Sequence, residues 1–563
     1  MDFLFVPLAA SVGASVDQVK LIACLLVSYP LGSLFIRIPS SRPALKHLFN
    51  LSIAFFYFIP VLNLRVAFLQ LLGDVLATYF VTANVKGSHM PWIVFTFGET
   101  FMTFLSHVIR AMFAMGYETF DVTGPQMVLI MKLTTFAWNV YDGRRPAEVN
   151  NLLLIFSILP TNGHGQDLDR WQLQMKVSKF PSLLEFLGYA FYFPGVLVGP
   201  YLEYAAYSSL IDETLFKSYE SNATDDSRGN SVPQHRKRAI PDGRKRVAYR
   251  KGLWGLLYLG LFMAFSPSFY FGITITDWFA KQGLLYRIIY LQFCGFIERA
   301  KYYGIWILTE GASILTGLGF TGYGPSGKSL WEGAANVNVR LIEFPPNFKV
   351  LLDSWNMKTN VWLRECMYKR VTPKGKKPGF KSSMITFATS AFWHGVAGGY
   401  YLTFILGGFV QTAGRLCRTH IRPLVMSATV PALFNGSNGS PATIGAPAKS
   451  SLQGPKTTIK KLYDVLSIVV SILLVNYATV PFMLLNLKDS IDGWSHLAWY
   501  GHWMIGLCLL FFYAGGRRWL KKIQARRVQK ASAGSSSDDL NQIPNSIFPP
   551  VDSAAQEIEK RLD

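Results

Sequence analysis

The residue types best suited to chemistry are a histidine, His394, and an asparagine, Asn356, about 38 positions before it. His394 lies within residues 382–414, which contain no Lys, Arg, Asp or Glu. Ionisable groups at membrane depth are costly and usually face a protein interior or a watery cavity. An imidazole with an ordinary pKa of about 6.5 can take a proton from an alcohol. A carboxamide N–H can hold a carbonyl oxygen that gains negative charge. A structural histidine would suit this position equally well.

The segment that carries the asparagine is predicted to be helical over residues 356–370. Asn356 and Asn360 would then lie on one face, with Trp355 as an amphipathic aromatic at the membrane boundary. Residues 358–381 contain eight Lys or Arg and a single acid. This charge suits a polyphosphorylated ligand or the anionic surface of the membrane. The cations that we expect at such a ligand are Lys358, Arg364, Lys369 and Arg370.

The composition is typical of a protein that crosses the membrane many times. Half of the 563 residues are hydrophobic and only 16% are charged, and the apolar residues gather in repeated blocks. The net charge of +21 resides in the connectors between these blocks, as in cytoplasmic loops of membrane proteins. No nucleic-acid motif accompanies it, so nucleic acid is not an expected partner. The five cysteines form no Cys-x-x-Cys pair, so no metal site is expected.

We therefore predict an all-α fold of about ten to twelve transmembrane or re-entrant helices around a buried chamber. Residues 182–204 are broken by two Pro-Gly or Gly-Pro pairs and are expected to shape a pocket wall. Residues 283–320 predict two helices or one long helix. The expected organisation is N-terminal helices 1–213, a basic cytosolic loop 214–251, catalytic helices 252–417, a flexible loop 418–460, C-terminal helices 461–515 and a cytosolic tail 516–563 that is basic and then disordered.

The two short motifs resemble a known family. Trp393-His394-Gly395-x-x-x-Gly399-Tyr400, preceded by Trp355-Asn356-x-x-Thr359-x-x-Trp362-Leu363, is similar to the membrane-bound O-acyltransferase family, and more narrowly to its lysophospholipid acyltransferase branch. The resemblance covers about residues 15–520 and agrees with a polytopic helical fold.

The resemblance implies transfer of a fatty acyl group from acyl-coenzyme A to the free hydroxyl of a lysophospholipid. His394 matches the family's catalytic histidine, the general base, and Asn356 the motif residue that positions or polarises the reacting groups. No metal or prosthetic group is implied, because the thioester is already activated. Trp355, Asn360, Trp393 and Tyr400 are expected to shape the substrate tunnel.

Two alternatives remain open. The acceptor could be a sterol, a diacylglycerol or a peptide, because the choice of acceptor depends on the shape of the pocket. A transporter could use His394 as a proton relay, although transporters often show related halves and no internal repeat is found. The basic C-terminal cluster predicts a cytosolic C-terminus. The lipid substrates and the family resemblance suggest the endoplasmic reticulum membrane.

Overall fold

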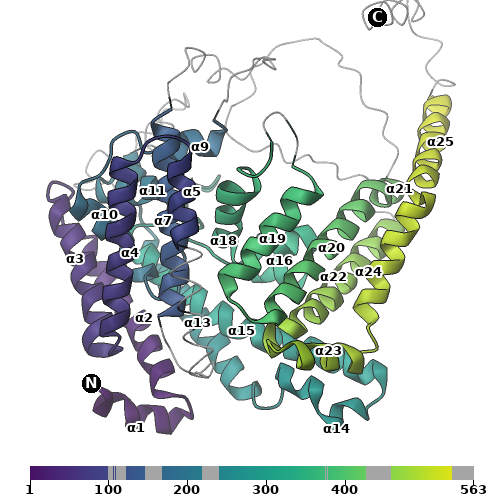
Figure 1. The fold of residues 1–563 in the computed structure, drawn as a ribbon, viewed down its shortest axis with the longest axis horizontal. Helices are drawn as coiled ribbons and strands as arrows, with labels where there is room; N and C mark the ends of the chain where they lie inside the picture. Colours follow the sequence, from purple (N-terminus) through teal and green to yellow (C-terminus); the bar gives the residue numbers. More distant parts are fainter. Residues whose placement is uncertain are drawn as a thin grey trace, which may run out of the picture. The chain divides into compact units, whose positions relative to one another are not determined.

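The structure is a computed structural model that describes residues 1–98, 106, 108, 122–145, 168–217, 240–373, 376, 378–426 and 458–535. These residues form helices and a single two-stranded hairpin (Figure 1). The chain divides into two compact units. The first comprises Met1–Thr412 and Ser467–Trp503, and the second Ala413–Leu466 and Met504–Asp563. The helical fold agrees with the predicted all-α class.

Several helices of the described chain are apolar, most of them in its N-terminal part. Four helical segments of the described chain are long and apolar enough to cross a membrane: Val16–Phe35, Pro43–Val61, Arg65–Asn84 and Thr458–Leu484. A bent pair near the C-terminus would make five. The total of ten to twelve stays a prediction. The N-terminal elements are α1 Asp2–Val12, α2 Val16–Phe35, α3 Pro43–Phe56 with the π-helical turn η1 Tyr57–Val61, α4 Arg65–Asn84, α5 His89–Thr96 and α7 Thr123–Gly143.

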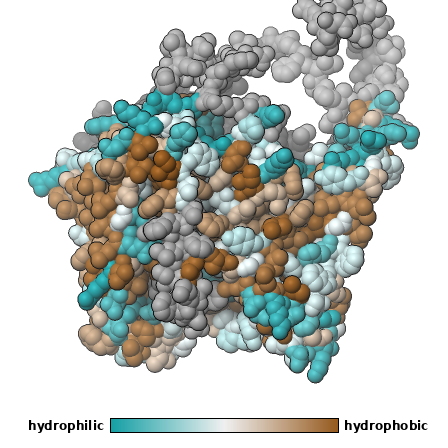
Figure 2. Space-filling view, viewed as in Figure 1, coloured by the Kyte–Doolittle hydropathy of each residue, from teal (hydrophilic) through white to brown (hydrophobic). Residues whose placement is uncertain are grey.

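The outer face of α4 is apolar. Val66, Leu69 and Phe80 expose 79%, 65% and 68% of their surface. Figure 2 shows hydrophobic side chains gathered over α3 and α4 on this flank. Exposed apolar side chains gathered in this way are typical of a surface that contacts lipid.

Residues 182–204 form an interrupted segment, as predicted. Helix α10, Leu183–Ala190, begins with a capping box between Ser182 and Glu185 and ends before the short 3₁₀ turn η3, Phe193–Gly195. The buried ammonium of Lys132 in α7 donates to the carbonyl oxygens of Tyr189 and Ala190, at 3.1 and 3.0 Å. The ammonium thus adds a donor to carbonyls at the end of α10, where intrahelical donors run out. Residues 198–201 then line a large cavity, which confirms the predicted pocket wall.

The long apolar block after residue 283 is one helix. Helix α15, Leu284–Thr316, packs against α13, Arg244–Phe265. Gly255 and Gly304 permit this contact, because a Cβ on Gly255 would lie 3.0 Å from the Gly304 oxygen. The remaining elements of this region are α9 Arg170–Met175, α11 Tyr204–Ile211, the 3₁₀ turn η4 Phe271–Ile275 and α14 Asp277–Ala280.

The structure corrects one predicted boundary here. Helix α13 begins at Arg244, so the end of the basic loop predicted over 214–251 is helical. The helix can begin among basic residues because Lys251 reaches the buried carboxylate of Glu310 in α15, at 2.9 Å. The Arg244 guanidinium also donates to the Leu315 carbonyl oxygen, at 2.7 Å. Pairing with α15 thus extends the helix into a hydrophilic stretch.

Between α15 and the histidine motif the chain forms short elements. The strands β1 Gly322–Tyr323 and β2 Ser329–Leu330 pair antiparallel, with Gly322 opposite Leu330. The helices that follow are α16 Val339–Glu343, α17 Phe348–Ser354, α18 Met357–Trp362, the π-helical segment η5 Leu363–Tyr368 and α19 Phe380–His394. The predicted helix 356–370 is therefore helical from Met357 to Tyr368.

The C-terminal helices extend beyond the predicted loop and tail boundaries. Helix α20 continues to His420 and α22 begins at Thr458, so both ends of the predicted loop 418–460 are helical. Residues 517–535, predicted as tail, form α25, whose Arg527 donates to the Pro423 carbonyl oxygen at 3.2 Å within the second unit. The elements are α20 Gly398–His420, α21 Arg422–Val425, α22 Thr458–Leu484, α23 Leu487–His496, α24 Tyr500–Phe511, the π-helical turn η6 Phe512–Gly516 and α25 Arg517–Ser535.

Candidate active site

The asparagine of the first motif lies at a tight corner between α17 and α18. Asn356 has φ 43° and ψ 55°, a left-handed conformation that asparagine tolerates better than most residues. Its side-chain oxygen accepts hydrogen bonds from the Asn336 amide at 3.0 Å and from the Thr359 hydroxyl at 2.8 Å. With the oxygen occupied twice, the N–H groups of the Asn356 amide are the ones presented to a ligand.

A second asparagine fixes the same corner. The Asn360 amide donates to the backbone oxygens of Leu352 and Trp355, the latter at 2.7 Å. Asn336 also binds the α18 backbone, because its side-chain oxygen accepts the Lys358 N–H at 3.0 Å. These hydrogen bonds join three segments and hold the left-handed residue in place.

The histidine of the second motif is the last residue of α19. Gly395 follows with φ 134°, a conformation that favours glycine, and the chain then enters α20. A Cβ on Gly399 would lie 2.0 Å from the Pro481 oxygen, so only glycine allows α20 to approach the end of α22 this closely. The Gly399 N–H donates to the Leu485 oxygen at 2.8 Å. The glycines of the motif therefore bring α22 against the histidine.

The imidazole of His394 lies among aromatic rings. Phe404 stacks on it with centroids 5.2 Å apart and an interplanar angle of 23°. Phe482 of α22 meets it edge to face at 4.9 Å, and the Tyr400 centroid lies 5.7 Å away. Trp393, which precedes it, is buried against Trp362 and donates from its indole N–H to the Met127 oxygen. This packing fixes the plane of the imidazole ring.

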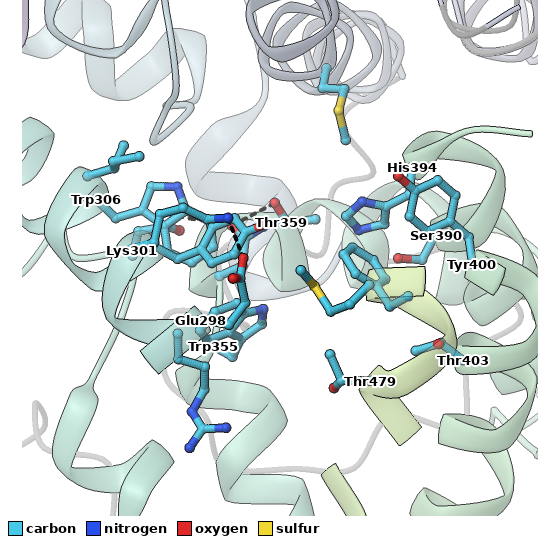
Figure 3. Close-up of a pocket in the computed structure, with 18 of the residues that line it drawn as sticks. Glu298, Lys301, Trp306, Trp355, Thr359, Ser390, His394, Tyr400, Thr403 and Thr479 are labelled. Carbon is cyan, nitrogen blue, oxygen red and sulfur yellow. Dashed lines mark hydrogen bonds and ion pairs between the residues drawn. The ribbon is translucent and has the colours of Figure 1, made fainter. Parts of the chain in front are cut away.

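Both motifs line one cavity of about 1900 Å³ within the first unit. Common small-ligand pockets enclose roughly 300–1,000 Å³, so this one could hold two large substrates together. Helices α7, α15, α18, α19, α20 and α22 all contribute to its wall. Figure 3 shows His394 on one side and Trp306 and Trp355 on the other, with Thr359 between them. The predicted residues that line the cavity are Trp355, Asn356, Lys358, Asn360, Arg364, Trp393, His394 and Tyr400.

Two predicted cations are engaged elsewhere. Lys369 pairs with the buried Glu365, at 2.6 Å, and with Asp169. Arg370 binds both carboxylate oxygens of Asp142, at 3.0 and 2.6 Å. Neither belongs to the lining residues of the cavity. Burial alone would raise the pKa of the Asp169 carboxyl, but the hydrogen bond from Lys369 and the N–H groups that Asp169 caps hold it below the ordinary value.

The sequence did not point to several residues of the site. Asn336, Phe404 and Phe482 complete the surroundings of the two motif residues. Phe404 follows Tyr400 by four positions, one helical turn, which could have placed it beside the histidine. Asn336 and Phe482 lie in distant segments, and nothing in their spacing marks them.

The site and fold define a polytopic helical membrane protein in which a histidine and an asparagine amide line the same large cavity. Residues 109–437 match the membrane-bound O-acyltransferase family, and this match includes both motifs. The chain belongs to that family, so it is an acyltransferase of membranes.

Curated relatives cover nearly the whole chain. It is 37% identical to the "Lysophospholipid acyltransferase" of Schizosaccharomyces pombe over 93% of this chain and 92% of that protein. Identity to the "Lysophospholipid acyltransferase" of Saccharomyces cerevisiae is 33%, over 91% of this chain and 76% of the other. The mouse "Membrane-bound glycerophospholipid O-acyltransferase 1" is 28% identical over 90% and 91% of the two chains.

Proposed function

We propose that this protein transfers a fatty acyl group from acyl-coenzyme A to the free hydroxyl of a lysophospholipid. The observation that carries the proposal is the presence of His394 and Asn356 on the wall of one cavity large enough for both substrates. The names of its relatives support a lysophospholipid as acceptor.

His394 acts as the general base. It takes the proton of the acceptor hydroxyl while the hydroxyl oxygen attacks the thioester carbonyl. A C–O ester bond forms, the C–S bond breaks, and the proton passes to the departing thiolate. The stacked and edge-on rings of Phe404 and Phe482 hold the imidazole in one orientation during this transfer. An activated thioester needs no metal or prosthetic group for this step.

Asn356 stabilises the carbonyl oxygen of the thioester during the reaction. Its amide N–H groups stabilise the oxygen that becomes negative in the tetrahedral intermediate, because its own oxygen is already held by Asn336 and Thr359. Lys358 and Arg364, which line the same cavity, supply positive charge for the phosphates of coenzyme A. Lys369 and Arg370, which the sequence also predicted for these phosphates, are ion-paired with acids and lie outside the lining of the cavity, so the proposal does not include them.

The reaction is proposed to occur in the endoplasmic reticulum membrane, with the C-terminus in the cytosol. The dense Lys and Arg cluster of residues 517–527 supports this orientation. Coenzyme A is charged and water-soluble, whereas the acyl chain and the lysolipid reside in the membrane. A cavity with cationic and apolar lining suits both kinds of group.

The test is acyl transfer in microsomes from labelled oleoyl-coenzyme A to lysophosphatidylcholine, at matched expression of the intact protein, His394→Ala and Asn356→Ala. The proposal expects labelled phospholipid from the intact protein and about 10²–10⁴-fold less from His394→Ala. A fully active His394→Ala would overturn the mechanism. If the intact protein acylates no lysolipid, sterol, diacylglycerol and peptide acceptors are tested in its place.

A further inference from the structure

The cavity wall formed by α15 carries a group of polar and aromatic side chains that the acyl-transfer step does not use. We call it the α15 wall and define it as Glu298, Lys301, Tyr302, Trp306 and Trp355, the last from the corner before α18. All five line the cavity. Figure 3 shows Glu298, Lys301, Trp306 and Trp355 together on the side away from His394.

An ion pair forms the polar half of the α15 wall. The Lys301 ammonium contacts the Glu298 carboxylate three residues earlier, and the side chains expose 30% and 14% of their surface. Charged groups in a membrane protein are costly, and they usually mark a substrate path when they face a cavity. A carboxylate has about four lone-pair positions, so Glu298 can accept a second cation while it holds Lys301.

The neighbouring Arg299 has a different task. Its guanidinium makes two parallel hydrogen bonds to Glu343, at 2.9 and 2.8 Å. The Tyr303 hydroxyl donates to the same carboxylate at 2.6 Å. This bidentate pair joins α15 to α16 and occupies the Arg299 fork. The charged members of the α15 wall are therefore Glu298 and Lys301, which are paired with each other.

Three electron-rich rings form the other half. The ring centroids of Tyr302, Trp306 and Trp355 lie 5.2 to 5.6 Å from one another, with Trp355 edge-on to the other two. The face of an aromatic ring attracts cations. The Lys301 ammonium already lies 5.1 Å from the Tyr302 centroid, so this wall holds one cation over a ring face.

We propose that the α15 wall binds the head group of a zwitterionic lysophospholipid, with the phosphate at Lys301 and the ammonium at Glu298 and the aromatic rings. This inference rests on the proposed function and adds the class of acceptor. The ion pair is neutral as a whole, and so is a phosphocholine or phosphoethanolamine head group. The negative and positive groups of this pair can each face the opposite charge of such a head group.

A head group without an ammonium fits this wall poorly. A phosphoglycerol head group brings one negative charge and no cation, so Glu298 would face it with a like charge. The rings would then contact hydroxyl groups where they could bind an ammonium ion. Specificity would arise from this repulsion as well as from the attraction of the ammonium.

The experiment compares kcat/KM for lysophosphatidylcholine and lysophosphatidylglycerol of the same acyl chain, with oleoyl-coenzyme A saturating. We expect the intact protein to prefer the choline lipid. Glu298→Gln should lower kcat/KM for the choline lipid about tenfold, through loss of a charge-assisted contact, and should raise kcat/KM for the glycerol lipid, because the like charge is removed. The matched control Asp464→Asn removes a carboxylate that pairs with Lys460 in the second unit, and it should leave both values unchanged.

Two further variants separate the parts of the wall. Lys301→Gln should lower kcat/KM for both lipids, because both carry the phosphate. Trp306→Leu should lower the choline value more than the glycerol value while the KM for oleoyl-coenzyme A stays constant, which also shows that the variant is folded. These changes test the wall even if Glu298→Gln fails to accumulate.

Each outcome bears on a different statement. If active Glu298→Gln and Trp306→Leu keep the intact protein's ratio of choline to glycerol activity, the head-group site is wrong and the acyltransferase proposal stands. A preference of the intact protein for the glycerol lipid also overturns the site. If the intact protein acylates neither lipid nor any other lysolipid, the proposed function itself fails.

Discussion

The two halves of the site are held in place by different forces. Asn356 is fixed by hydrogen bonds of defined direction, from Asn336 and Thr359. His394 is surrounded by rings, of which Phe404 and Phe482 approach within 5.2 and 4.9 Å. A directional bond is lost with one atom, whereas several ring contacts share the task of orientation. The asparagine side should therefore be the more sensitive to changes in its neighbours.

The largest effect should come from the histidine itself. His394→Ala removes the proposed general base, and we expect kcat to fall by about 10²–10⁴-fold. The ring contacts would be lost too, so the folded state is checked by the KM for acyl-coenzyme A, which should stay within about twofold because the cations lie on the other motif. His89→Ala, at an exposed position on α5, is the control and should be fully active. If His394→Ala were as active as His89→Ala, His394 would not be the general base.

The next prediction tests the hydrogen bonds that hold Asn356. Asn336→Asp keeps an acceptor for the Lys358 N–H but replaces the donor to the Asn356 oxygen by a second acceptor. The Thr359 hydroxyl is then the remaining donor to the Asn356 oxygen and the new carboxylate repels that oxygen, so the orientation of the amide weakens; we expect kcat to fall about tenfold with little change in either KM.

Assays of purified protein in which the concentration of each substrate is varied in turn separate kcat from KM. Asn84→Asp, at an exposed position whose amide bonds only within its own helix, is the matched control. A rise in KM with constant kcat would show that Asn336 supports binding and not the orientation of Asn356.

A third prediction distinguishes the cations near Asn356 that line the cavity from Lys369, which lies outside its lining. Lys358→Gln and Arg364→Gln should each raise the KM for acyl-coenzyme A about three- to tenfold, because both line the cavity. Lys369→Gln should leave that KM unchanged. It should lower the melting temperature in detergent, since the buried Glu365 loses one of its two cations. A raised KM for acyl-coenzyme A in Lys369→Gln would show that Lys369 does contribute to coenzyme A binding.

The sequence predicted much of this site. Because one motif placed His394 in a long uncharged stretch and the other placed Asn356 at a helix start, their presence at one cavity could be expected. The pairing of Lys369 with Asp169 and of Arg370 with Asp142 could not be predicted, since these acids lie 200 and 228 positions away; only the Lys369–Glu365 pair follows from helical spacing. Charge spacing describes one segment, whereas the ion pairs depend on how distant helices pack.

The residues that contact His394 and Asn356 from distant segments could not be predicted for the same reason. Phe482 reaches His394 only because glycine at 399 lets α20 approach the end of α22. Asn336 reaches Asn356 through a connector whose composition gave no such signal. Likewise, the start of α13 at Arg244 depends on partners in α15, so a basic sequence predicted as loop became helix.

The smallest expected effect tests the shared support of the histidine. Phe482→Leu removes one edge-to-face contact, worth about 0.5–1.5 kcal/mol, while Phe404 remains stacked on the ring. We expect kcat to fall about two- to fivefold, less than for Asn336→Asp, and Phe80→Leu on the exposed face of α4 to have no effect. Phe404→Leu combined with Phe482→Leu should lose more than the product of the single effects, because each ring compensates for the other. If Phe482→Leu alone lowered kcat as much as Asn336→Asp does, the histidine and the asparagine would be equally sensitive to their neighbours. The contrast between the two halves of the site would then be wrong.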